Sequence, residues 1–91
     1  MVNGQSAERN VTVTNPAGLH ARPCAAIVQT VRKFNAKVQI LCRGQSINAG
    51  NILEIMTLGA GQGTPLVLKA QGPDAEPVLD ALVLELAKHY E

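Results

Sequence analysis

His20 and Arg22 are the residues whose chemistry is most informative, and they lie two positions apart in the segment 18–23, Gly-Leu-His-Ala-Arg-Pro. An unprotonated imidazole is a nucleophile at neutral pH. A guanidinium offers a planar fork of hydrogen-bond donors that matches phosphate oxygens. The pair therefore predicts a site for a phosphate-like anion, with His20 able to take the group covalently. The alternative is that His20 only caps a helix beside a surface arginine.

A helix is expected to start directly after His20. Apolar residues recur beyond it at helical spacing, at Cys24, Ile27, Val28 and Val31. Pro23 falls in the first turn, where its missing N–H is not needed, so the pattern predicts a helix from about residue 21 to about residue 33. His20 would then sit at or beside the N-cap. The unbonded N–H groups and the positive dipole end of a helix start favour a bound phosphate.

The rest of the chain predicts four strands and two more helices around this site. Alternating apolar residues indicate strands near residues 11–14, 38–42, 47–49 and 65–70. A short helix is expected from Asn51 to Gly59, because Asn51 and Glu54 form a capping-box pattern and glycine ends helices. A last helix should open at Asp74 and bury an apolar stripe. That stripe consists of Leu79, Leu82, Val83 and Leu86.

The resulting order, βαββαβα, predicts an α+β fold in two layers. Three helices would cover one face of a four-stranded, mostly antiparallel sheet, and the alternating strands would leave the other face to water. The 91 residues suffice for one compact domain. We place this domain at residues 8–91, after a flexible N-terminal tail at residues 1–7.

Composition and charge argue against several classes of protein. The net charge is +1 and the eight basic residues are scattered, whereas nucleic-acid binders concentrate theirs in a patch. No apolar run approaches the roughly 20 residues of a membrane span, and the polar N-terminal segment lacks the apolar stretch of a signal peptide. Two cysteines are too few for a disulfide framework. We therefore expect a cytoplasmic protein that binds neither nucleic acid nor membrane. We also expect it to be a monomer.

The segment 18–23 resembles the active-site motif of the HPr phosphocarriers of the bacterial phosphotransferase system. The end of the short helix at Leu58-Gly59, the turn at residues 61–63 and the element order are similar too, so the resemblance covers residues 10–90. It implies an open-faced β-sandwich, phosphorylation of His20 at Nδ1 by enzyme I with phosphoenolpyruvate, and transfer to an enzyme IIA domain. Arg22 would steady the phosphoryl group. The resemblance implies a carrier in a relay rather than a stand-alone enzyme, and no cofactor.

Two positions depart from the family pattern. Many Gram-positive relatives carry a regulatory serine at the cap of the short helix, where this chain has Asn51. Ser46 lies five residues earlier, in the expected return strand, and does not match that position. The third residue before the histidine is often Asn or Ser in the family, and here it is Ala17. We therefore expect no regulatory serine and one polar contact fewer near the active loop.

The short helix is apolar on nearly every side, with Ile52, Leu53, Ile55 and Met56. A helix lying on a sheet buries only one face. We expect Ile55 to face the core with Leu58, and Ile52, Leu53 and Met56 to form an exposed docking patch. The resemblance implies the same, because family partners bind at the matching helix and at the first helix. The alternative is that all four side chains belong to the core.

Two other sites have less support. His20, Cys24, Cys42 and His89 are ligand types for zinc, but their spacing is not that of a zinc module, so no metal site is expected. The glycine-rich segment 59–63 lacks the spacing of a nucleotide-binding loop and follows a helix instead of a strand.

Three functions stay open at this point. They are a sugar-type phosphocarrier, a nitrogen-type regulatory relay protein, and a module that holds an anion without covalent transfer. Acid-labile, base-stable phosphate on His20 would separate the last from the first two.

Overall fold

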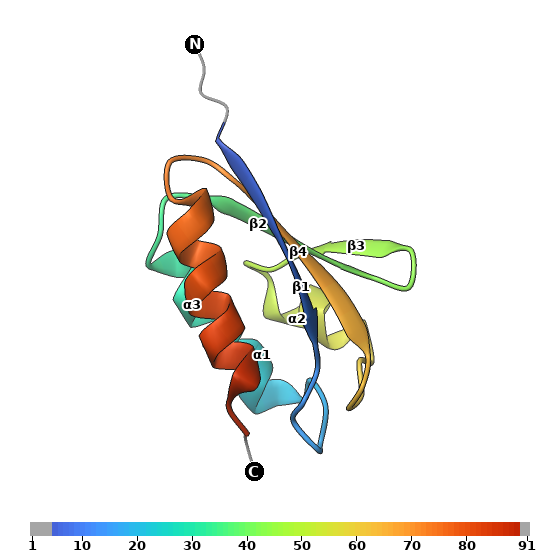
Figure 1. The fold of residues 1–91 in the computed structure, drawn as a ribbon. Helices are drawn as coiled ribbons and strands as arrows, with labels where there is room; N and C mark the ends of the chain where they lie inside the picture. The colour runs from blue at the N-terminus through green and yellow to red at the C-terminus, as the bar shows by residue number, and fades with distance from the viewer. Residues whose placement is uncertain (1–4, 90–91) are drawn as a thin grey trace.

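Residues 5–89 are described by a computed structural model, in which four strands form one sheet and three helices lie on one of its faces (Figure 1). The strands are β1 (Ser6–Thr12), β2 (Lys37–Cys42), β3 (Gln45–Asn48) and β4 (Pro65–Gln71). The helices are α1 (Ala21–Arg32), α2 (Ile52–Met56) and α3 (Ala75–Ala87). The predicted order βαββαβα is confirmed, and with it the open-faced sandwich.

The sheet has the strand order β1-β4-β2-β3, and each neighbouring pair is antiparallel. The central strand β4 pairs with both β1 and β2, so Lys69 stands opposite Glu8 on one side and Gln39 on the other. Helix α3 lies against β1 and β4, and α1 packs beside α3 with the opposite direction (Figure 1). This arrangement sets the start of α1, and hence His20, at one end of the helical layer.

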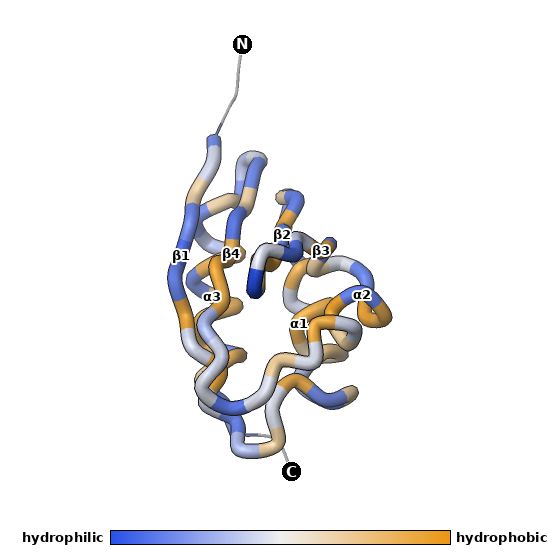
Figure 2. The backbone as a smooth tube through the Cα atoms, turned by 90° about the vertical axis from the view of Figure 1, so that its right-hand side faces the viewer, coloured by the Kyte–Doolittle hydropathy of each residue, from blue (hydrophilic) through white to orange (hydrophobic). Residues whose placement is uncertain are grey.

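The core lies between the sheet and the helices. Alternate residues of the inner strands point into it, and the predicted inward set Val38, Ile40 and Cys42 of β2 is buried. Figure 2 shows that the strands contain both hydrophobic and hydrophilic residues. Burying a side chain the size of Ile40 contributes about 1.5–3 kcal/mol to folding. The inner strands β2 and β4 each supply several such residues, so the packing of the helices on the sheet stabilises the fold.

Strand β1 begins earlier than the sequence predicts. The expected strand near residues 11–14 is in fact Ser6–Thr12, so Ser6 and Ala7 belong to the sheet and not to the tail predicted for residues 1–7. Of the rest of that tail, Gln5 accepts the backbone N–H of Gly72 at 2.9 Å, and residues 1–4 lie outside the described residues. The strand forms because β4 offers a complete antiparallel partner, from Ser6 opposite Gln71 to Thr12 opposite Pro65. Because β1 contains charged residues, the alternation of apolar and polar residues that predicts a strand is not visible in this part of the sequence.

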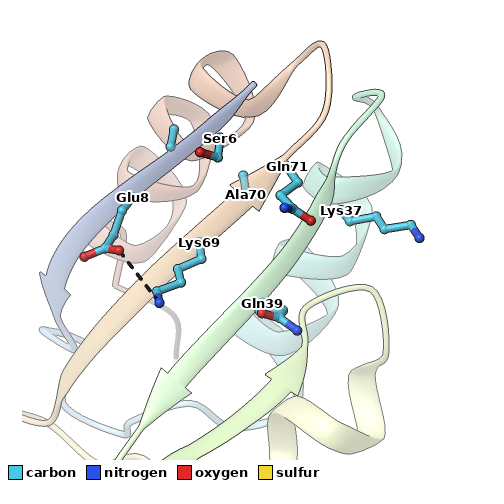
Figure 3. A pocket seen from close by; sticks show the side chains of 8 residues that line it. Ser6, Glu8, Lys37, Gln39, Lys69, Ala70 and Gln71 are labelled. Carbon is cyan, nitrogen blue, oxygen red and sulfur yellow. Dashed lines mark ion pairs between the residues drawn. The ribbon is translucent and has the colours of Figure 1, made fainter. Parts of the chain in front are cut away.

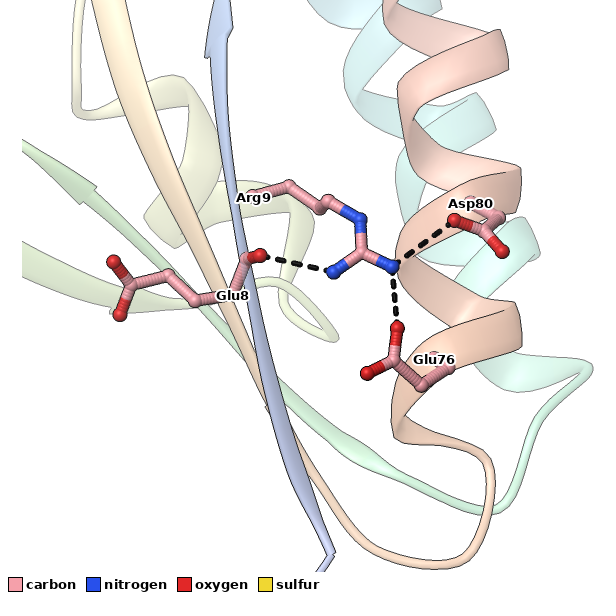
Figure 4. A network of polar contacts seen from close by, with 4 residues as sticks. All are labelled: Glu8, Arg9, Glu76 and Asp80. Atoms are coloured by element: carbon pink, nitrogen blue, oxygen red, sulfur yellow. Dashed lines mark hydrogen bonds and ion pairs between the residues drawn. The ribbon is translucent and has the colours of Figure 1, made fainter.

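Arg9 is a charged residue on the inner side of β1, and its position is explained by two carboxylates on α3. Its guanidinium donates to the carboxylates of Glu76 and Asp80 on α3, the latter at 3.2 Å, and to the backbone carbonyl of Glu8 at 2.9 Å (Figure 4). The hydrogen bond to Glu76, then that to Asp80, raises the pKa of Arg9 above its ordinary value. The contact ties the edge strand β1 to α3.

Helix α3 opens after Asp74, as predicted, but its buried stripe differs from the predicted one. Asp74 is the N-cap residue, but its side chain makes no capping bond and instead accepts the backbone N–H of Asn35 at 2.6 Å. Val78 is fully buried, whereas the predicted Val83 is only partly buried. The carboxylate of Asp74 therefore fastens the turn after α1 to the start of α3.

Candidate functional site

His20 is the N-cap residue of α1, as predicted. Its backbone is extended, with φ −89° and ψ −170°, and its carbonyl accepts the first helical N–H, from Cys24, at 3.1 Å. The ring nitrogen Nδ1 accepts the backbone N–H of Arg22 at 3.4 Å. An Nδ1 atom that accepts carries a lone pair, so the proton of the neutral ring is assigned to Nε2. The cap contact thus presents the nucleophilic lone pair at Nδ1.

The other ring nitrogen has a different environment. Nε2 of His20 is buried, and within residues 5–89 it has no hydrogen-bond partner. A buried donor without an acceptor costs about 1–3 kcal/mol. The long Nδ1 contact and the unsatisfied Nε2 leave the ring weakly restrained by hydrogen bonds, although its backbone is fixed.

Arg22 lies in the first turn of α1 and is exposed. The first turn contains no acidic residue, so no carboxylate of that turn competes with an incoming anion. The structure therefore places the two predicted residues His20 and Arg22 at the same helix start, where free backbone N–H groups and the helix dipole favour a phosphate.

The loop before His20 is held against the loop between α2 and β4. The backbone N–H of Leu19 donates to the carbonyl of Ala60 at 2.8 Å. Gly18 has φ +74°, and a Cβ atom there would stand 2.7 Å from the carbonyl oxygen of Ala60 and 2.9 Å from Cα of Gly61. Glycine is thus required at position 18 both by its backbone angle and by the close approach.

Asn51 is the N-cap residue of α2, as predicted, but the predicted capping box does not close. Oδ1 of Asn51 accepts the backbone N–H groups of Leu53 and Glu54 at 3.0 and 3.2 Å. The carboxylate of Glu54 does not return to the cap residue and accepts the N–H of Asn48 instead, at 3.1 Å. The reason is that the N–H of Asn51 is already bonded to the carbonyl of Asn48.

The apolar residues of α2 divide as expected, with one correction. Ile55 is fully buried and Leu58 nearly so, whereas Leu53 is 71% exposed and Met56 is 42% exposed. Ile52 was expected in the docking patch, but it is only partly exposed and packs against the core. Ile52 is the first residue of this five-residue helix, and its side chain packs against the core from the first turn. The name docking patch is kept below for Ile52, Leu53 and Met56.

The turn between β2 and β3 touches the end of α2. Arg43 and Gly44 form this two-residue turn with φ values of +50° and +81°, as hairpin turns of this length require. The guanidinium of Arg43 donates to the carbonyls of Leu58 and Gly59 at 3.3 and 3.4 Å. Arg43 therefore supplies the positive charge that α2 lacks in its own last turn.

The zinc ligand types noted in the sequence do not gather. Among the described residues, no group of three or more His, Cys, Asp or Glu side chains is placed to hold a metal. Cys24 and Cys42 are buried, and burial raises the pKa of the Cys24 thiol from 9.0 to about 11. Within residues 5–89, no helix has the length and apolar character needed to cross a membrane.

A hollow in the sheet is remote from His20. It has a volume of about 540 Å³ and lies on the exposed face of the sheet, between β1, β4 and β2. Figure 3 shows that most of its side chains are polar and that Lys69 faces Glu8 on the neighbouring strand; the two charged groups are 3.9 Å apart. A shallow hollow that contains one ion pair and amide groups gives no chemistry comparable with that at the start of α1, so we do not place the site there.

Two residues of the loop contacts were not singled out in the sequence. Asn15 lies in the loop between β1 and α1, yet it is 2% exposed and its Nδ2 donates to the carbonyl of Gly18 at 2.8 Å. Ala60, which accepts from Leu19, lies 41 positions further along the chain. The Asn-Pro sequence at 15–16 gave a turn signal, but no signal along the chain pointed to Ala60.

Known proteins resemble this chain over most of its length. A family profile described as "PTS HPr component phosphorylation site" matches residues 7–88. A phosphocarrier protein HPr of Buchnera aphidicola is 38% identical over 77 residues, which is 85% of this chain and 91% of the relative. One of Xylella fastidiosa strain Temecula1 is 40% identical over 75 residues, covering 82% and 84%.

Solved structures agree with this result. A crystal structure of an HPr from Bacillus anthracis has a TM-score of 0.83 and 36% identity, covering 88% of this chain and 95% of that one. An HPr from Thermoanaerobacter tengcongensis has a TM-score of 0.84 and 35% identity, covering 92% and 99%. The fold, the helix start with its histidine and arginine, and these similarities lead to one conclusion: the chain belongs to the HPr family of the phosphotransferase system.

Proposed function

We propose that this phosphocarrier accepts a phosphoryl group on Nδ1 of His20 from enzyme I and passes it to an enzyme IIA domain. The observation that carries the proposal is the cap contact, in which Nδ1 accepts the N–H of Arg22 and so holds a lone pair. In the forward step a bond forms between Nδ1 and phosphorus. The bond between phosphorus and the donor breaks, its electron pair stays with the donor, and Nε2 keeps its proton. The onward step is the same exchange in reverse with a new acceptor.

The helix start assists this exchange with its own groups. When Nδ1 binds phosphorus, the N–H of Arg22 loses its acceptor and becomes available to a phosphoryl oxygen. The helix dipole contributes about 0.3–1 kcal/mol to an anion at this position. A hydrogen bond from the guanidinium of Arg22 would contribute about 1.5–3 kcal/mol, because both partners are charged. We assign Arg22 to stabilising the phosphoryl group and not to binding the partner protein.

The docking patch is proposed as the contact for both partners. Leu53 and Met56 are exposed apolar side chains on a helix next to α1, and methionine adapts well to different surfaces. Changing Leu53→Glu should raise the KM for enzyme I, because an unpaired carboxylate must be desolvated at the interface. Leu84→Glu is the matched control, since Leu84 is 69% exposed but lies on α3. An equal effect of both changes would remove the docking patch from the proposal.

We also propose that the protein is a monomer and that it acts in the cytoplasm, together with enzyme I and the phosphoryl donor of enzyme I. Sedimentation at working concentrations tests the monomer. A dimer as the main species would contradict it.

Intact mass after incubation with enzyme I and phosphoenolpyruvate tests the acceptor. We expect one added phosphoryl group that is lost in acid and kept in base. His20→Ala should abolish it, and His89→Ala, at an exposed histidine, should not. Phosphate retained in His20→Ala would overturn the assignment, and so would full acid stability.

A further inference from the structure

Asn15 is the one buried residue with an amide side chain in the loop before His20. It is 2% exposed, although the residues on either side of it, Thr14 and Pro16, are exposed. Burying an amide is unfavourable unless its polar atoms are bonded. It therefore matters which groups the buried side chain of Asn15 binds.

Two hydrogen bonds of Asn15 converge on a single residue, Gly18. Its backbone carbonyl accepts the N–H of Gly18 at 2.8 Å, and its side-chain Nδ2 donates to the carbonyl of Gly18, also at 2.8 Å. Both ends of residue 18 are thus held by one residue. With φ fixed at +74°, Gly18 has little freedom to rotate the chain that follows.

The next residue is held in the same way from the other side. The N–H of Leu19 donates to Ala60, and the carbonyl of Leu19 accepts a weak bond from Sγ of Cys24 at 3.6 Å. His20 comes directly after this restrained pair. Because its ring is weakly held, with one contact of 3.4 Å at Nδ1, the direction of the imidazole depends on the backbone that carries it.

We propose that Asn15 is a positioning residue for phosphoryl transfer, which fixes the direction of the His20 imidazole by holding the backbone N–H and carbonyl of Gly18. The inference rests on the proposed function of His20. Asn15 does not touch the transferred group, so its loss should lower the rate of transfer within the complex and leave partner binding unchanged. Misplacing a reacting group by about 1 Å can cost a factor of about 100 in rate.

The test measures transfer from enzyme I at a temperature where every variant is folded. Asn15→Ala removes the amide, and Asn15→Ser keeps a polar group that is too short to reach the Gly18 carbonyl. We expect kcat to fall by about tenfold or more in both, with KM changed by less than about twofold. The signal of the Arg22 amide proton, which reports its contact with the imidazole, should shift in both variants.

A destabilised control separates positioning from stability. Val78→Ala truncates a fully buried side chain in the first turn of α3, which begins at the opposite end of the helical layer from the start of α1 (Figure 1). It should lower the melting temperature and leave kcat at the parent value. If the Asn15 variants keep the parent kcat while folded, the inference is wrong even though His20 is the acceptor. If the parent itself takes up no phosphate, the proposed function fails first.

Discussion

Gly18→Ala should damage both the stability and the transfer activity of this protein. An L-residue at φ +74° costs about 1–2 kcal/mol relative to glycine. The new Cβ would stand 2.7 Å from the carbonyl oxygen of Ala60, and this is a backbone atom that cannot rotate away. Relieving such overpacking costs about 1–3 kcal/mol. We therefore expect the free energy of unfolding to fall by about 2–5 kcal/mol, out of the 5–15 kcal/mol typical of domains.

Gly44→Ala is the matched control for the backbone angle. Gly44 has φ +81°, but nothing lies within 4 Å of the position of its Cβ. Denaturant unfolding of both variants should show the smaller loss for Gly44→Ala, about 1–2 kcal/mol, and the difference isolates the clash with Ala60. Transfer from enzyme I should be slowed only in Gly18→Ala. Equal losses of stability in the two variants would refute the close contact of the two loops.

Four further outcomes are expected. Leu53→Glu should leave the melting temperature within a few degrees of the parent, because an exposed side chain gives up little burial; a collapsed melt would show that the residue is buried. Arg22→Ala should slow transfer while changing the free energy of unfolding by less than about 0.5 kcal/mol, and unchanged rates with both partners would remove it from the mechanism. An HPr kinase should not phosphorylate position 51, since Asn51 has no hydroxyl, and peptide mapping of the kinase product checks this. Burial raises the pKa of the Cys24 thiol to about 11, so the thiol ionises at a lower pH in the unfolded chain than in the folded protein. The contribution of this thiol to the free energy of unfolding should therefore be complete below pH 9 and be lost as the pH rises toward 11. A free energy of unfolding that stays constant between pH 8 and 10.5 would contradict this.

The start of α1 could be predicted because its signals are local. Pro23 restricts the first turn, the apolar stripe has helical spacing, and so His20 had to stand at the cap. The N-cap at Asn51 was found for the same reason. In each case the residues that decide the structure lie within a few positions of one another, so the sequence pattern contains the answer.

Features that depend on distant partners could not be found in this way. Strand β1 extends to Ser6 because β4 pairs with it, although the two are more than fifty residues apart. The rotation of α2 was only partly predictable, since a helix that is apolar on every side does not reveal how far Ile52 reaches toward the core. The contact of Leu19 with Ala60 likewise depends on how α2 packs.

The most direct test follows one labelled phosphoryl group through the chain. The protein is labelled with radioactive phosphoenolpyruvate and enzyme I, purified away from both, and then mixed with an enzyme IIA domain. The account predicts that the label is first on the peptide containing His20, at Nδ1 of the ring, and that it then leaves this peptide and appears on enzyme IIA in equal amount. Label that sits on another residue, or that stays on His20 when the acceptor is added, would contradict the account.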